Sequence, residues 1–224
     1  MRRIQCALLS TAAVIGFASV ASAADMPVKA PEAATFEQRW YVESRLAVGI
    51  IPRYSVSTTG LGDGTYAPQH AFNLAFDVGI YLTRNWRAEV EVALGRISQG
   101  TAYGLPHSGS ARMLTLLGNA LYSFDAPWPW MRPYVGGGVG LVNTQVSRIG
   151  AIGGAFVIDG SATAFAAALH AGLDFPVWQR LTITSRYTAL WTGSESFGSI
   201  PAGVTLTKKP SLDNIFTVGL RYNI

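Results

Sequence analysis

The sequence predicts an all-β protein: an eight-stranded antiparallel up-and-down transmembrane β-barrel. Apolar residues make up 49% of the chain and charged residues only 13%, a composition typical of a membrane protein rather than a disordered one. Beyond the N-terminus, no run of 18 apolar residues could form a helical span. Apolar and polar residues instead alternate with a period of two. A closed barrel is the other structure that satisfies every backbone polar group in lipid.

Residues 1–23 have the features of a signal peptide. Arg2 and Arg3 supply the positive start, an apolar stretch follows, and Ala21-Ser22-Ala23 matches a small-x-small cleavage site. We therefore expect an exported protein. The only cysteine, Cys6, lies within this segment, so the mature chain would contain no disulfide.

Residues 24–38 contain two prolines and no alternation, and we expect a periplasmic lead-in there. Residues 39–224 would form the barrel domain. The clearest strand is 71–82, AFNLAFDVGIYL, in which every second residue is large and apolar. A helix cannot separate the two sets of side chains, because its period is 3.6 residues. The same reasoning predicts strands at 40–50, 71–82, 86–97, 111–124, 133–146, 163–175, 181–191 and 213–224.

The segment 162–171, ATAFAAALHA, is rich in alanine and favours a helix by intrinsic propensity. We interpret it as a strand because its alternation is intact and a barrel needs an even number of strands. Short turns are expected near 83–85, 125–132 and 176–180, with longer external loops near 51–70, 98–110, 147–161 and 192–212. Aromatic residues gather at the short-turn ends, as in an interfacial girdle.

The charged residues of the predicted strands almost all share the inward parity. An outward arginine or lysine would cost about 2–4 kcal/mol at the membrane midplane, so this parity fixes the register. Arg96 and Arg112 are exceptions, both near strand ends. Two interpretations remain open: a lumen packed with ion pairs, or a narrow polar path for ions or small solutes. The predicted lumen residues are Glu43, Arg45, Asp77, Arg87, Glu89, Glu91, Asp174, Arg186 and Arg221.

Several fragments resemble the OmpA-like transmembrane barrel, and more narrowly the small surface-antigen and porin-family barrels of alphaproteobacteria. They are WYVESRLAVG (40–49), NALYSFD (119–125), RPYVGGGVGL (132–141) and FTVGLRYNI (216–224). The resemblance implies a Gram-negative outer-membrane location. It also implies that the last strand carries the signal for the barrel-assembly machinery, with Ile224 in place of the usual final aromatic. The residues of that signal would be Phe216, Val218, Leu220, Tyr222 and Ile224.

The sequence contains little that suggests catalysis. A lipid A deacylase would need a serine, a histidine and an acid within hydrogen-bond reach, and His170 is followed by Ala171 and Gly172 rather than a serine at the family spacing. We therefore expect no enzyme, no cofactor and no metal site. No run of lysine and arginine suggests nucleic-acid binding.

Positive residues near the outer rim are candidates for contact with lipopolysaccharide phosphates. They are Arg53, Arg96, Arg112, Arg148, Lys208 and Lys209. Our first functional hypothesis is an envelope-stabilising barrel whose loops act in antigenicity or adhesion. The alternatives are a low-conductance channel and, third, an enzyme that modifies lipid A.

Overall fold

A computed structural model describes residues 40–47, 54–59, 62–102, 105–125, 128–151, 157–200 and 205–224. The predicted signal peptide, the lead-in and Arg53 lie outside these ranges. No helix in the described ranges has the length and hydropathy to cross a membrane.

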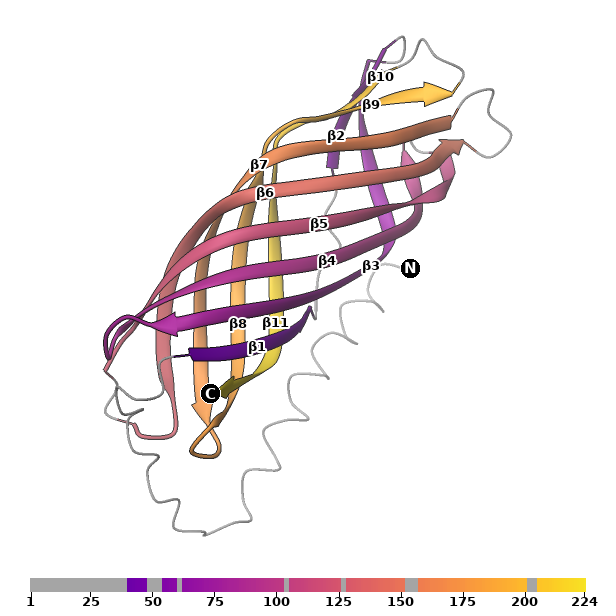
Figure 1. Cartoon of the computed structure of the whole chain (residues 1–224). Coiled ribbons are helices and arrows are strands. Elements are labelled where there is room, and N and C mark those ends of the chain that lie inside the picture. Colours follow the sequence, from indigo (N-terminus) through magenta and orange to yellow (C-terminus); the bar gives the residue numbers. More distant parts are fainter. Residues whose placement is uncertain are drawn as a thin grey trace, which may run out of the picture. The chain divides into compact units, whose positions relative to one another are not determined.

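Eleven strand segments form one antiparallel sheet (Figure 1). They are β1 (Trp40–Ala47), β2 (Tyr54–Thr58), β3 (Gly62–Tyr81), β4 (Trp86–Ala102), β5 (Leu105–Ser123), β6 (Arg132–Ala151), β7 (Val157–Pro176), β8 (Leu181–Thr192), β9 (Glu195–Ile200), β10 (Thr205–Lys208) and β11 (Ser211–Asn223). The alanine-rich segment 162–171 lies within β7, so its interpretation as a strand is confirmed.

The sheet closes into a barrel of eight strands at two levels. At the end that carries the chain's C-terminus, β1 pairs with both β3 and β11. At the other end β2, β10 and β9 bridge β3 to β7. The pairs β1/β2, β8/β9 and β10/β11 each take the place of one barrel strand, because each occupies the same position around the ring. The predicted closed antiparallel barrel is confirmed.

The seam of the barrel joins the two ends of the domain. Tyr41 on β1 is opposite Asn223 on β11, and the backbone N–H of Ile224 donates to the carbonyl of Trp40 at 2.9 Å. We call the ring at this end, closed by β1 and β11, the lower ring, and the ring closed by β2, β9 and β10 the upper ring. The lower ring is therefore completed by β11 and Ile224.

An apolar band covers the outer face of the lower ring. Outward side chains such as Val78, Val90 and Leu169 are more than half exposed, which is the signature of a surface solvated by acyl chains. On β4 the band runs from Trp86 to Leu94, about 26 Å along the strand at ~3.3 Å per residue. Exposed aromatics gather at the short-turn end: Trp40, Trp86, Phe124, Trp128, Trp130, Trp178 and Tyr222.

Beyond this band the polarity of the wall inverts. Inward side chains become apolar, in a cluster of Tyr54, Ile97, Ala111, Val146, Ile158 and Phe197. Outward side chains become hydroxylated or charged, as in the hydrogen-bonded pair Ser196 and Thr207, with 3.1 Å between their oxygens. The upper part of the wall is thus patterned like a water-soluble barrel.

The four predicted long loops were wrong in extent. β2, β9, β10 and the ends of β3 to β7 occupy much of 51–70, 98–110, 147–161 and 192–212. The physical reason is the change of solvent. A rule that requires large apolar residues to face outward recognises strands only where lipid surrounds them, and these segments are rich in glycine, serine and threonine.

Inward glycines make room for tyrosine rings in the lower lumen. Tyr41 is opposite Gly79, and Tyr134 is opposite Gly172. A Cβ atom at either glycine would overlap the tyrosine ring, so each pair stacks a ring over a bare backbone.

The position of the lipid band predicts a depth-dependent effect of charge. Replacing outward Val90 with arginine should lower the free energy of unfolding by about 2–4 kcal/mol. Ser161→Arg, on the exposed outer face of β7 above the band, should change it by less than about 1 kcal/mol. Urea titration in lipid vesicles, followed by tryptophan fluorescence, measures both. Equal effects at the two sites would show that the band is misplaced.

Candidate functional site

All nine charged residues predicted for the lumen are buried, and their side chains meet inside the lower ring. They come from β1, β3, β4, β7, β8 and β11, so the cluster exists only when the barrel is closed. Five carboxylates face four guanidinium groups. Buried charges persist in proteins when they are paired, and here the pairs link strands far apart in the sequence.

Arg186 lies at the centre of the cluster. Its Nη1 is 2.6 Å from Glu89 Oε1 and 3.4 Å from Glu91 Oε2, and its Nε donates to the hydroxyl of Tyr134 at 3.1 Å. Asp77 and Glu43 each lie 3.9 Å from its guanidinium. One cation therefore interacts with four of the five acids.

Arg45 makes a two-pronged pair with Asp77. Its Nη2 is 2.6 Å from Oδ1 and its Nε is 3.0 Å from Oδ2, the fork geometry that matches a carboxylate. The same Nη2 reaches Glu91 Oε2 at 2.9 Å. Arg45 thus ties β1 to both β3 and β4.

A second set of pairs lies nearer the short turns. Asp174 accepts from Arg87 at 2.8 Å and from Arg221 at 2.7 Å. Arg221 also pairs with Glu43 at 2.8 Å, and Glu43 in turn lies 3.3 Å from Arg45. The nine charges therefore form one connected network rather than separate pairs.

Neutral side chains also join this network, and the charge pattern alone did not indicate them. Arg87 Nε and Nη2 and Arg186 Nη2 nevertheless have no hydrogen-bond partner among the described residues. The Tyr41 hydroxyl donates to Glu89 at 2.7 Å, and Asn119 donates to Glu89 and Glu91 at 3.2 Å. His170 lies between Asn119 and Thr188, with contacts of 3.2 and 3.0 Å. Inward parity was the signal for all of them, because each shares it with the charges.

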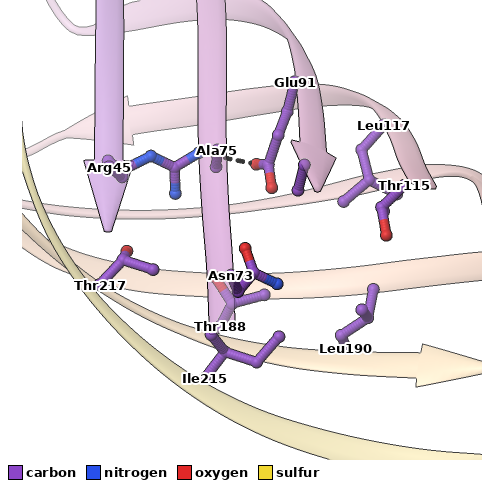
Figure 2. A pocket seen from close by; sticks show the side chains of 11 residues that line it. Arg45, Asn73, Ala75, Glu91, Thr115, Leu117, Thr188, Leu190, Ile215 and Thr217 are labelled. Carbon is purple, nitrogen blue, oxygen red and sulfur yellow. Dashed lines mark hydrogen bonds and ion pairs between the residues drawn. The ribbon is translucent and has the colours of Figure 1, made fainter. Parts of the chain in front are cut away.

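An apolar layer lies directly above the network. It consists of Leu117, Val142, Ala166, Ala168 and Leu190, all at most 5% exposed. Between the two layers is a cavity of about 20 Å³, enough for a single water molecule. In Figure 2, Arg45 reaches Glu91 on one side of this cavity, while Leu117 and Leu190 lie among its other lining residues.

A separate charged cluster lies where β8 gives way to β9 and β10 to β11. Lys208 Nζ is 3.1 Å from Glu195 Oε2 and 4.9 Å from the centre of the Tyr54 ring. Glu195 Oε1 and Asp213 Oδ1 are both buried without a hydrogen-bond partner among the described residues. Burial raises the pKa of the Tyr54 hydroxyl, and the negative charges of Asp213 and Glu195 raise it further.

This cluster corrects the prediction for Lys208, which was expected at the outer rim in contact with lipopolysaccharide. Lys208 is only 8% exposed and points into the barrel. The sequence pattern did not reveal this, because 192–212 was interpreted as a loop. Alternation tells which side chains point inward only in a strand.

The rim candidates Arg96, Arg112, Arg148 and Lys209 lie on the outside of the wall. Arg96 and Arg112 are exposed and stand opposite each other on β4 and β5. Arg148 is exposed near the end of β6, and Lys209 pairs with Asp63 at 2.6 Å. Contact of these residues with lipopolysaccharide stays a prediction.

The residues predicted as the assembly signal form the outward face of β11 and the residue that follows it. Phe216, Val218, Leu220, Tyr222 and Ile224 are each 46–60% exposed. Their part in assembly likewise stays a prediction.

Among the described residues, one group of acids has oxygens close enough to hold a metal ion. Ligand atoms of Asp77, Glu89 and Glu91 lie within 4.8 Å of one another. Arg45 and Arg186 already contact these carboxylates, however, and a cation placed among them would face two guanidinium groups. The donor set therefore fits internal ion pairing better than metal binding.

The network predicts a strong penalty for removing its central cation. Arg186→Met should lower the free energy of unfolding by about 3–5 kcal/mol, because Glu89 would remain buried without its main partner. The double variant Arg186→Met/Glu89→Met should recover a large part of this loss. Urea titrations in vesicles measure both, and a cost of the single variant below about 1 kcal/mol would contradict the pairing.

The upper cluster predicts opposite effects for its two acids. Asp213→Asn should raise stability, because it removes a buried charge with an unpartnered oxygen. Glu195→Gln should lower stability, because it leaves buried Lys208 without its 3.1 Å partner. Urea titration of each variant measures the shift of the unfolding midpoint, which should be upward for Asp213→Asn and downward for Glu195→Gln. Shifts of the same sign would mean that Lys208 is shared differently between the two acids.

Comparison with known proteins places the barrel in a family. No curated protein matches the sequence. Among solved structures, the chain is similar to neisserial surface protein A, at 19% identity and a TM-score of 0.50, covering 83% of this chain and 97% of that one. It is also similar to OprG of Pseudomonas aeruginosa, at 12% identity and a TM-score of 0.55, covering 83% and 96%.

A third similar structure is the outer membrane protein AlkL in lipid bilayers, at 18% identity and a TM-score of 0.57, covering 83% of this chain and 90% of that one. At these identities the three structures support the fold alone. The family described as outer membrane protein beta-barrel domain matches residues 10–223, nearly the whole chain. The chain belongs to this family of β-barrels, which reside in the Gram-negative outer membrane.

Proposed function

We propose that this barrel is a sealed structural element of the outer membrane that presents a surface outside the cell, rather than a channel. The observation that carries the proposal is the filled lumen. Nine buried charges form a connected network, and an apolar layer follows directly above it. Ions would have to break paired charges and then cross a tightly packed layer whose side chains are mostly aliphatic.

The narrow space between the layers supports the same proposal. The cavity there has room for about one water molecule, and its lining combines the paired Arg45 and Glu91 with aliphatic side chains and four neutral polar ones, Asn73, Thr115, Thr188 and Thr217. A conducting pore of eight strands would need a continuous wet path, and a barrel of this size is only just wide enough for its side chains to fill.

The upper wall supports a surface role. β3, β6 and β7 each have 20 residues, about twice the length needed to cross a bilayer as a strand. The part beyond the apolar band has a polar outer face and a largely apolar interior, which is the pattern of a wall that faces water. We propose that this projecting part carries whatever antigenic or adhesive contacts the protein makes.

We also propose that the protein is not an enzyme. His170, the histidine within the lumen, has both ring nitrogens engaged by Thr188 and Asn119. A general base must act on a nucleophile that a substrate can reach, and both His170 and Thr188 are buried inside the filled lumen.

Assembly through the barrel-assembly machinery is the matching proposal for β11. Its outward residues alternate as the resemblance requires, and Ile224 presents an exposed aliphatic side chain in the final position. Ile224→Phe should therefore raise the folded yield, read as the heat-modifiable band on a gel of outer membranes. An unchanged yield would show that residue 224 is not part of the assembly signal.

Single-channel recording in planar bilayers tests the sealed lumen. The folded full chain should give no stable current steps, because the ionic and apolar layers block the axis. Heat-modifiable migration of the same sample confirms that the inserted protein is folded. Reproducible steps above the bare-bilayer background would overturn the proposal in favour of a low-conductance channel.

A further inference from the structure

Two arginines on the lipid-facing side of the wall stand directly opposite each other. In the antiparallel pair of β4 and β5, Arg96 is the register partner of Arg112, and both side chains are outward and exposed. Directly opposite residues have Cα atoms about 4.5–5.5 Å apart, so the two guanidinium groups share one small area of surface. Like charges in this arrangement destabilise a sheet.

No acid within the described residues neutralises this pair. Elsewhere on the outside of the wall, Arg84 and Arg132 lie near Asp125 and Lys209 lies near Asp63, whereas Arg148 and Arg180 have no second cation opposite them among the described residues. In the described part of the chain, no ion pair joins Arg96 or Arg112 to a carboxylate. The register partner of Arg112 on β6 is Gln145, which is neutral.

The pair also lies at a defined depth. Immediately below it, Leu94 is opposite Leu114, and each is 47% exposed at the upper edge of the apolar band. On β7 the band ends at Phe165, and the next outward residues, Thr163 and Ser161, are hydroxylated. Arg96 and Arg112 therefore stand where acyl chains give way to headgroups.

We propose that Arg96 and Arg112 together bind a phosphate group of an anionic outer-leaflet lipid. Guanidinium groups are planar forks that bind phosphate oxygens in pairs, and two opposed forks can hold one phosphate from both sides. The anchored acyl chains of the lipid pack on Leu94 and Leu114 below. A phosphate at this position removes the repulsion that the bare pair carries.

Titration with phosphorylated lipid A, followed by native mass spectrometry of the refolded full chain, tests this proposal. Arg96→Gln/Arg112→Gln should weaken lipid A binding about tenfold or more, since two charged contacts are lost. The matched control is Arg84→Gln/Arg180→Gln, which removes the same charge from exposed positions at the short-turn end. Its affinity should stay within about twofold of the parent value.

A second variant guards against misfolding. Arg96→Glu places an acid opposite Arg112, which should stabilise the β4–β5 pair while abolishing phosphate binding. Folding is checked by the heat-modifiable gel shift.

Three outcomes would overturn the proposal. The first is equal lipid A affinity in the parent and both Arg96 variants, and the second is equal loss in the short-turn control. The third is equal affinity for dephosphorylated lipid A. Competition by inorganic pyrophosphate at the concentrations at which lipid A binds would assign the site to free phosphate instead of a lipid. None of these outcomes depends on whether the lumen conducts.

Discussion

The pairing of buried charges inside the lower ring is the interaction on which the rest of this structure depends. An eight-stranded barrel in lipid must turn its apolar residues outward, so its interior is left to polar side chains. Charges buried there without partners would destabilise the barrel. The network avoids this because it connects acids and arginines from six strands through Arg186, Arg45 and Asp174. Because these partners are distant in sequence, they meet only when the ring is closed.

The lumen changes character along its axis, and the change follows the surroundings of the wall. Within the lipid band, charges lie inside and hydrocarbon outside. Above it, Tyr54, Ile97 and Phe197 pack inside while serine and threonine hydroxyls lie outside. The Lys208–Glu195 pair lies at the junction, where two strands are interrupted. The same barrel wall is therefore surrounded by lipid in its lower part and by water in its upper part, and the order of its strands around the ring is the same in both.

The sequence predicted the lower ring well and the upper ring poorly, for one physical reason. In lipid, an outward charge is so costly that parity identifies the lumen residues, including Glu43, Asp77 and Arg221. In water no such penalty operates, so Lys208 was taken for a rim residue and β2, β9 and β10 for loops. The partners within the network also escaped prediction. Parity says that Arg87 and Asp174 point inward, but only the closed ring brings them within 2.8 Å.

The seam between Trp40 and Ile224 has a consequence for biogenesis. Because β1 pairs with β11, the seam-facing edge of β1 cannot be covered until β11 has been exported. During that interval β1 and β11 are open edges that can pair with other chains. Removal of β11 would therefore leave β1 with β3 as its only partner and the lower ring open.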